Sequence, residues 1–143
     1  MTAEPHWDHF EDERGLGVIG VGGSLASAFG EAARGLTALV TDLGKVRLRD
    51  DAEIKLPGAA PENLLPAWLN AVIAEMDARQ MLFGDFELYI DERELVARLY
   101  GEPFDPHRHH PAARLKRAVA APEIRQEDVD TWIVSCVIEV DKG

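Results

Sequence analysis

The first third of the chain changes from an alternating pattern to a helical one. Residues 16–21 alternate as in a short strand, and a turn follows at the next two glycines. Ser24 can cap a helix, because its hydroxyl can accept a hydrogen bond from a free N–H of the first turn. Over residues 25–40 the apolar positions recur at three- and four-residue steps, which is the period of one buried helical face. The pattern therefore predicts a strand and then a helix that ends near Thr41.

The middle of the chain predicts a second helix after another strand region. Residues 46–56 alternate apolar and polar side chains, which is the period of a half-buried strand or of a hairpin bent near its middle. Residues 65–76 have the helical period, and Pro61 and Pro66 are compatible with that helix only before or within its first turn. Asn63 is the candidate N-cap residue of this helix.

The last part of the chain is strand-like. Residues 86–90 and 95–100 flank a polar turn and predict a β-hairpin. Residues 116–124 predict a further strand, which Pro122 interrupts. Residues 131–140 are apolar on both alternating faces, as in a central strand that is covered on both sides. With about six strands and two amphipathic helices, we expect an α+β fold in which two helices pack on a mostly antiparallel or mixed sheet.

Composition indicates one soluble domain over residues 1–143. The chain has 143 residues, of which 46% are apolar, so a single hydrophobic core is expected. Residues 1–13 carry acidic residues and histidines without an apolar core, which predicts a flexible stretch and not a secretory signal. No apolar run approaches the ~20 residues of a membrane span, so the expected location is the cytoplasm. Cys136 lies in an apolar stretch and is expected to be a small buried hydrophobe.

The acidic charge disfavours direct binding to nucleic acids. The formal charge is −11, from 26 acidic and 15 basic residues. Phosphate backbones repel such a surface unless its basic residues cluster strongly. Docking on a basic protein partner remains compatible with this charge, because complementary charges raise association rates.

Three polar features are candidates for chemistry. Asp12 belongs to an acidic stretch, residues 8–13, whose carboxylates could hold a hard cation or could simply be a solvated N-terminus. The imidazoles of His107 and His109 could share a zinc ion, or the histidines of this loop could hydrogen-bond the backbone. Glu139 lies among apolar neighbours and must be paired, metal-bound or exposed at an edge, because burying an unpaired charge is costly.

Classical catalytic motifs are absent from the sequence. It has no Walker loop, Rossmann fingerprint, nucleophile elbow or paired-cysteine zinc motif. The glycines before the first helix lack the lysine and the spacing of a phosphate-binding loop, which favours a tight turn. Lys116 follows Leu115 at the start of its predicted strand, and most lysines in such a position are solvated surface residues. The residues alone thus indicate an acidic α+β domain with a candidate carboxylate site.

Short motifs spaced along almost the whole chain form one recognisable set. They are His9 through Asp42, Leu64-Leu65 with Trp68-Leu69-Asn70, Leu82-Phe83-Gly84-Asp85-Phe86, Gly101-Glu102-Pro103 with Asp105, Arg108 and His109, Leu115-Lys116, and Trp132 with Cys136-Val137-Ile138-Glu139-Val140. In order and spacing this set resembles the archease family. The resemblance implies an α/β sandwich protein that is not itself an enzyme.

The resemblance also implies a partner. Archeases assist the RtcB-type RNA ligase, which joins RNA ends bearing a 2′,3′-cyclic or 3′-phosphate to a 5′-hydroxyl in tRNA splicing and RNA repair. They promote guanylylation of the ligase histidine and so support multiple turnover. Lys116 and His109 would take part in activating this partner.

A divalent cation site, often for calcium, is a further implication of the resemblance. Family members use the aspartate of a His-x-Ala-Asp-Ile-Gly motif together with an aspartate and main chain near the C-terminus. In this sequence Gly15 stands at the motif aspartate, which leaves Asp12, Glu139 and Val140 as the candidate ligands. Either an acidic residue of the preceding loop reaches the site, or Arg14 replaces the cation by pairing with Glu139, or the site is lost.

Two other functions compete with ligase activation. The first is a diverged protein-interaction module that keeps the fold without the activating role. The second is a metal-dependent enzyme that uses the histidine loop and the carboxylates, which the absent motifs disfavour.

Overall fold

The computed structural model describes residues 4–119 and 122–141. Within these residues the elements in chain order are β1 (His6–Asp12), β2 (Gly15–Gly22), α1 (Leu25–Val40), η1 (Leu43–Lys45), β3 (Asp50–Pro57), α2 (Pro61–Arg79), β4 (Met81–Ile90), β5 (Glu94–Pro103), α3 (Pro106–His109), β6 (Arg114–Ala118), β7 (Glu123–Asp128) and β8 (Thr131–Asp141). In this part of the chain no helix is long and apolar enough to cross a membrane.

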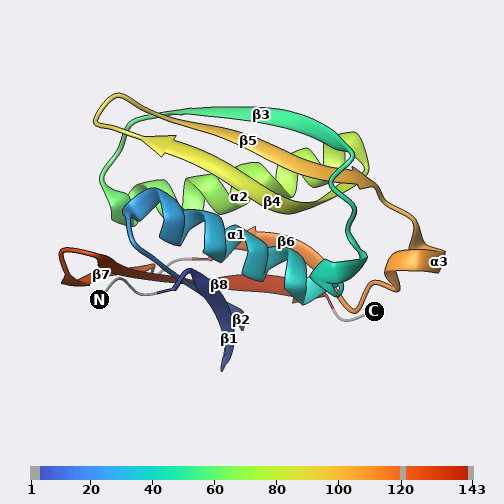
Figure 1. The fold of residues 1–143 in the computed structure, drawn as a ribbon. Coiled ribbons are helices and arrows are strands. Elements are labelled where there is room, and N and C mark those ends of the chain that lie inside the picture. The colour runs from blue at the N-terminus through green and yellow to red at the C-terminus, as the bar shows by residue number, and fades with distance from the viewer. Residues whose placement is uncertain (1–3, 120–121, 142–143) are drawn as a thin grey trace.

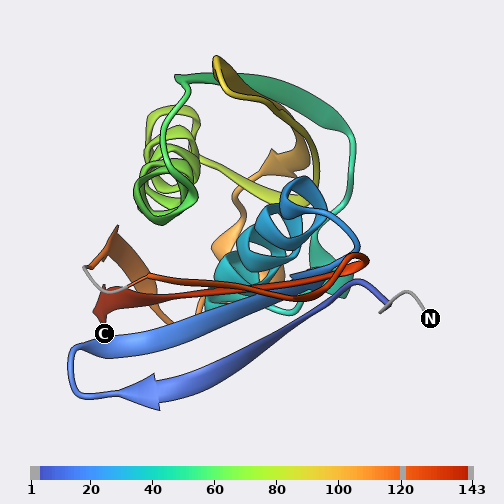
Figure 2. The ribbon, with the colours of Figure 1, turned by 90° about the vertical axis from the view of Figure 1, so that its left-hand side faces the viewer.

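The strands form two antiparallel sheets with the helices between them. The larger sheet has the order β1-β2-β8-β6. β7 and β6 lie along the same edge of β8: β7 pairs with its first half and β6 with its last residues. The smaller sheet has the order β3-β5-β4. Figure 1 shows α1 and α2 as a layer between the two sheets, and Figure 2 shows the same layers after a turn of 90°. The predicted α+β fold is confirmed, although the hydrophobic pattern did not separate the strands into two sheets.

The predicted hairpin and the predicted central strand are both present. β4 and β5 pair from Met81↔Pro103 to Ile90↔Leu95. β8 lies between β2 on one side and β6 with β7 on the other. On its inner face Val134, Cys136 and Ile138 are buried, and its other face is only partly buried. The central position is therefore confirmed, and the predicted cover on both faces is only partial.

Helix α1 forms where the sequence predicts it and packs closely on the larger sheet. The Ser24 hydroxyl accepts a hydrogen bond from the N–H of Ser27 at 3.1 Å, which confirms the predicted cap. Gly20 in β2 lies directly beneath the helix. A Cβ built on Gly20 would lie 2.1 Å from the carbonyl oxygen of Ala28, so the close approach requires glycine at this position.

Helix α2 begins earlier than the apolar period suggests. It starts at Pro61, with Ala60 as the N-cap residue and no side-chain cap, so the prediction of an Asn63 cap was wrong. Pro61 already fixes the first helical φ and needs no N–H partner, which removes the need for a cap at Asn63. Pro66 lies inside the helix, beyond the first turn. It has no N–H to donate to the carbonyl oxygen of Glu62, an exposed residue, so the helix lacks one hydrogen bond there.

The two helices are joined at the centre of the hydrophobic core. Trp68 is fully buried, and its indole Nε1 donates a hydrogen bond of 3.0 Å to the carbonyl oxygen of Phe29 in α1. Its ring also meets Phe86 of the smaller sheet edge-on, with ring centroids 5.9 Å apart. Trp68 therefore contacts both the first helix and the second sheet.

The N-terminal stretch differs from the expectation of flexibility over residues 1–13. Residues 1–3 lie outside the described residues, but His6–Asp12 is strand β1 and pairs with β2 along its whole length. The His9 ring nitrogen Nε2 donates to the carbonyl oxygen of Gly35 at 2.7 Å, and the Phe10 ring covers Gly17. His9 on one face of β1 thus attaches this acidic segment to α1, and Phe10 on the other face attaches it to β2.

Two other strand predictions are resolved by the structure. Of the two alternatives for residues 46–56, the half-buried strand is correct: β3 runs from Asp50 to Pro57 and pairs with β5, and no hairpin forms within the segment. The strand predicted over residues 116–124 is divided into β6 and β7, with residues 120–121 outside the described residues. Pro122 lies in this break, as expected for a residue that cannot donate to a ladder of hydrogen bonds.

Candidate functional site

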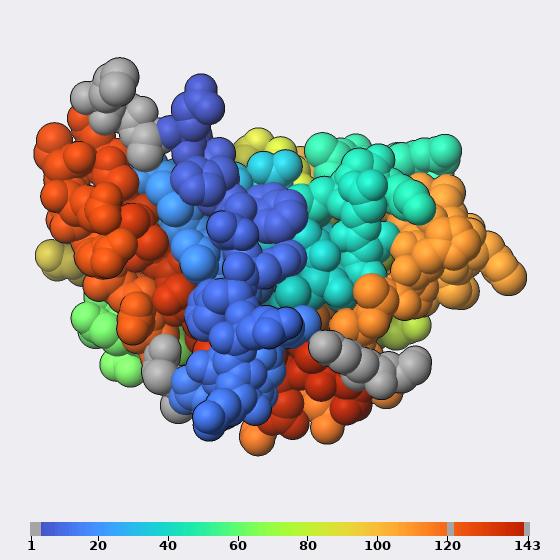
Figure 3. Space-filling model, turned by 90° about the horizontal axis from the view of Figure 1, so that it is seen from below, coloured from blue at the N-terminus to red at the C-terminus, as the bar shows by residue number. Residues whose placement is uncertain are grey.

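The predicted ligand residues lie at one end of the larger sheet. The turn between β1 and β2 brings Asp12 opposite Gly15, and the pairing of Leu16 with Ile138 sets Gly15 beside Glu139. A hollow of about 400 Å³ opens here, and Val140 lines it together with residues 12–16. Figure 3 shows the tip of the β1–β2 hairpin against the C-terminal end of β8. We call Asp12, Arg14, Lys116, Arg117, Glu139 and Asp141 the sheet-end cluster.

Asp12 is held by Arg14 within the turn. Its Oδ1 accepts hydrogen bonds from the backbone N–H of Arg14 at 2.9 Å and from Nε of the same residue at 3.0 Å. Its Oδ2 accepts from Nη2 of Arg14 at 3.2 Å. These side-chain and backbone hydrogen bonds lower the pKa of Asp12, and the same contact raises the pKa of Arg14. The sequence hypothesis that Arg14 pairs with Glu139 is therefore replaced by a pair with Asp12.

Glu139 is held by two basic side chains of β6. Its Oε1 lies 3.6 Å from Nζ of Lys116, and its Oε2 accepts a hydrogen bond of 3.2 Å from Nε of Arg117. Nζ of Lys116 also lies 3.5 Å from Oδ1 of Asp141. The Glu139 side chain is only 32% exposed, so it is paired and does not project from a free edge.

The donor set at the sheet end does not fit a divalent cation. Calcium takes six to eight oxygen ligands, yet the carboxylates of Asp12 and Glu139 already face cationic side chains. Gly15 supplies no side chain, and a Cβ there would lie 2.0 Å from the carbonyl oxygen of Ile138. Across residues 4–119 and 122–141, no three side chains of His, Cys, Asp or Glu gather in a way that could hold a metal ion.

A second cluster is buried where β5 meets α3; the family resemblance pointed to His109, but the sequence did not predict that Glu102 pairs with it. Glu102 and His109 have 2% and 1% of their surface exposed. His109 Nδ1 accepts a hydrogen bond of 2.9 Å from the backbone N–H of Asp105, so Nε2 carries the proton that is donated to Oε2 of Glu102 at 3.0 Å. Of the two predictions for the histidines of this loop, hydrogen bonding to the backbone is therefore the one that holds for His109.

Glu102 also joins the loop before β3 to this cluster. It accepts a hydrogen bond of 2.7 Å from the backbone N–H of Arg47 and forms an ion pair with Arg108. Arg108 in turn donates to the carbonyl oxygen of Lys45 at 2.6 Å. The hydrogen bond from Arg108 lowers the pKa of Glu102 most, to about 2, while burial opposes the shift and Arg47 and His109 support it.

Strand alternation gave no signal for this cluster. Glu102 lies on the same side of β5 as Arg98 and Tyr100, the less buried face of the hairpin, and it is enclosed by the loop before β3 and by α3. A buried carboxylate needs partners, and Arg108 and His109 follow one turn of chain later. Because His109 is enclosed, its predicted effect on a partner would have to act through the position of α3.

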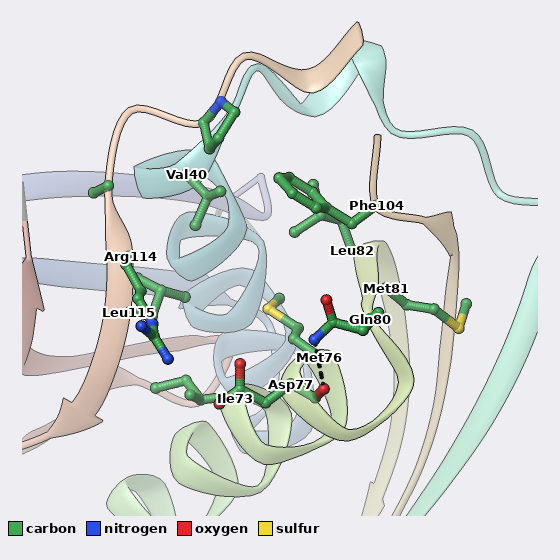
Figure 4. Close-up of a pocket in the computed structure, with 12 residues that line it drawn as sticks. Val40, Ile73, Met76, Asp77, Gln80, Met81, Leu82, Phe104, Arg114 and Leu115 are labelled. Carbon is green, nitrogen blue, oxygen red and sulfur yellow. Dashed lines mark hydrogen bonds between the residues drawn. The ribbon is translucent and has the colours of Figure 1, made fainter. Parts of the chain in front are cut away.

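An apolar pocket lies beside the buried cluster. It has a volume of about 350 Å³ and is lined mainly by Val40, Ile73, Met76, Leu82, Phe104 and Leu115. Figure 4 shows Arg114 on one wall and Asp77 with Gln80 on the other. The Phe104 ring stacks on the His109 ring, with centroids 5.8 Å apart. The pocket and the Glu102–His109 pair thus share one wall.

Cys136 has the environment that the sequence predicts. It is 1% exposed in the middle of β8. Burial raises the pKa of its thiol to about 11, so the reactive thiolate is scarce at neutral pH. The residue is a small buried hydrophobe.

Comparison with known proteins gives one consistent family. The model of the Archease protein family (MTH1598/TM1083) matches residues 7–140. The protein archease of Sulfolobus acidocaldarius is 30% identical over 142 residues, which cover 98% of this chain and 100% of the relative. The protein archease of Aeropyrum pernix is 32% identical over 139 residues, which cover 94% of this chain and 96% of the relative.

Two solved structures have a similar fold. The solution structure of Methanobacterium thermoautotrophicum protein 1598 matches with a TM-score of 0.72 at 21% identity, and the match covers 96% of this chain and 98% of that one. The crystal structure of an archease from Thermotoga maritima, described as a possible chaperone, matches with a TM-score of 0.59 at 15% identity over 91% of this chain and 94% of that one. At these identities the structures support the fold alone.

Proposed function

The chain belongs to the archease family, and from that premise we propose that it is an accessory protein of an RtcB-type RNA ligase. In this role it promotes guanylylation of the ligase histidine and multiple turnover in tRNA splicing or RNA repair. It acts on the ligase without catalysing a reaction itself. The observation that carries the proposal is the extent of the family match, which runs over residues 7–140, from within β1 to within β8.

Lys116 is the residue that we expect to contact the ligase, as the family resemblance implies. Its side chain is 46% exposed and stands in the sheet-end cluster, at the same end as the β1–β2 turn. The charge of the chain, −11, supports docking on a basic surface and opposes direct RNA binding. His109 supports this role from within, because it fixes α3 before the chain enters β6.

A guanylylation assay tests the proposal. The RtcB-type ligase of the same organism is incubated with labelled GTP and manganese, with and without this protein, and the labelled ligase is followed over time. We expect a faster rate and repeated ligation cycles when the protein is present. An unrelated protein of similar negative charge is the control for non-specific effects. Equal rates with and without the protein would contradict the proposal.

A second function is favoured by the altered sheet end. Arg14 and Gly15 replace residues that the family resemblance implies at the cation site, which is compatible with an interaction module that has lost the activating role. Such a module would bind the ligase, as measured by co-purification, and leave its guanylylation rate unchanged.

A further inference from the structure

The carboxylates of the sheet-end cluster are neutralised by basic side chains of the same chain. Arg14 engages both carboxylate oxygens of Asp12. Lys116 lies within ion-pair distance of Glu139 and of Asp141, and Arg117 adds a second cation to Glu139. The cluster thus holds three acidic and three basic side chains, so each of its carboxylates already has a cationic partner; Glu13, which lines the same hollow, adds one further carboxylate.

The geometry of the turn makes the Asp12–Arg14 pair specific. Arg14 presents its guanidinium as a fork to the carboxylate and also donates its backbone N–H to Oδ1. A planar fork that donates two parallel hydrogen bonds is the arrangement in which arginine binds carboxylates best. A hard cation at Asp12 would have to displace this fork and break the backbone hydrogen bond.

The residues next to Asp12 provide few oxygen ligands for a cation that displaces Arg14. Gly15 has no side chain, and the carbonyl oxygen of Ile138 fills the space where its Cβ would stand. Calcium needs six to eight oxygens, and magnesium needs a near-octahedral shell. While Arg14 and Lys116 hold the carboxylates of Asp12, Glu139 and Asp141, too few protein oxygens are free to retain either ion.

We propose that Arg14 and Lys116 supply at the sheet end the positive charge that a divalent cation would supply, and that the protein therefore binds no divalent cation there. This inference concerns the isolated protein and does not depend on the ligase. If calcium binds to the protein, this inference is wrong but the proposed ligase activation is not affected. If the guanylylation assay shows no effect, the proposed function is wrong but this inference is not affected.

Calcium binding to the full chain is the direct test. Equilibrium dialysis against calcium chloride, with metal measured by mass spectrometry, gives the stoichiometry, and thermal unfolding with and without calcium gives the stabilisation. A ligand that binds only the folded state must raise the melting temperature. Sodium chloride at equal ionic strength is the control for screening. We expect no bound calcium and no calcium-specific rise in melting temperature.

A double variant tests whether the two basic residues are the cause. Arg14→Gln with Lys116→Gln removes the internal cations and keeps Asp12, Glu139 and Asp141. We expect this variant to bind calcium and to melt at least about 3 °C higher in its presence. The matched control is Arg98→Gln with Lys55→Gln, which removes the same charges from ion pairs with Asp51 and Glu53 on the smaller sheet.

The outcomes separate cleanly. Stoichiometric calcium on the unaltered protein overturns the inference. Calcium binding by the sheet-end variant and not by the matched control supports it. If neither variant binds calcium, or if both bind it equally, Arg14 and Lys116 do not stand in place of a cation. Circular dichroism of each variant establishes that it is folded before calcium is added.

Discussion

Nε2 of His109 lies 3.0 Å from Oε2 of Glu102, and both side chains are shielded from solvent. The pair connects the end of β5 to α3, and Arg47 and Arg108 extend it to the loop before β3. A carboxylate in such a position stabilises the fold only while it is charged.

Acid should therefore weaken the fold over a defined range of pH. The pKa of Glu102 is about 2 in the folded protein and ordinarily 4.5, so its stabilisation is complete above pH 4.5 and is lost as the pH falls through 2. A pKa difference of this size corresponds to about 3 kcal/mol. Urea unfolding from pH 7 to pH 2.5 should show this loss. In Glu102→Gln the protein should be less stable at pH 7 and should lose less stability below pH 4.5. Parallel pH profiles of the two proteins would contradict this role of Glu102.

Loss of the His109 ring should destabilise the protein. His109→Ala leaves the backbone N–H of Asp105 without its acceptor and Glu102 without one donor, which should cost at least about 2 kcal/mol. The matched control is His107→Ala in the same short helix, where an exposed side chain is removed and the change should stay within about 0.5 kcal/mol. Urea unfolding measures both. An unaltered stability of His109→Ala, combined with a loss of ligase stimulation, would instead indicate direct contact with the partner.

Lys116 should matter for the partner and not for the fold. Lys116→Ala should reduce the stimulation of guanylylation about tenfold, as expected for the loss of one charge-assisted contact. Its melting temperature should be nearly unchanged, because exposed ion pairs contribute about 0–1 kcal/mol. Lys55→Ala, which removes an exposed lysine that is paired with Glu53, is the control and should retain full stimulation. Equal stimulation by the two variants would exclude Lys116 as the contact.

Two glycines should respond in opposite ways to alanine. Gly20→Ala places a methyl group 2.1 Å from a backbone oxygen of α1 and should destabilise the protein by about 1–3 kcal/mol. Gly30→Ala places it 3.5 Å from the nearest side-chain atom, Cδ1 of Leu88, and should stabilise α1 by about 0.5–1 kcal/mol. Thermal and urea unfolding of both variants check the signs. A stable Gly20→Ala protein would show that α1 can move away from β2.

Periodic patterns predicted the elements better than their arrangement. The helix over residues 25–40 and the β4–β5 hairpin follow from side chains that are neighbours in sequence. Division into two sheets depends on which strand edges meet, and an alternating strand pattern is the same for either partner. The error over residues 1–13 has a similar origin, because the contact between His9 and Gly35 joins residues far apart in the chain.

The candidate site was predicted in part for the same reason. Sequence comparison brought Asp12, Gly15 and Glu139 to one end of the fold, and the register of β1, β2 and β8 places them there. The sequence could not show which carboxylate Arg14 binds. The side chain can turn toward Asp12, two residues earlier, or toward Glu139 on the neighbouring strand. Glu102 was named only as part of a motif, and its burial was not predicted, because that burial depends on packing between β5, α3 and the loop before β3.

The central position of β8 has a consequence for synthesis on the ribosome. Among the described residues β8 follows β2, β6 and β7 in chain order and pairs with all three, so its partners are translated before it. Until β8 emerges, β2 has only its hairpin partner, and β6 and β7 have no strand to join. The smaller sheet can form earlier, because β3, β4 and β5 are complete by residue 103. During translation the smaller sheet can therefore close while the larger one stays open until β8 is released.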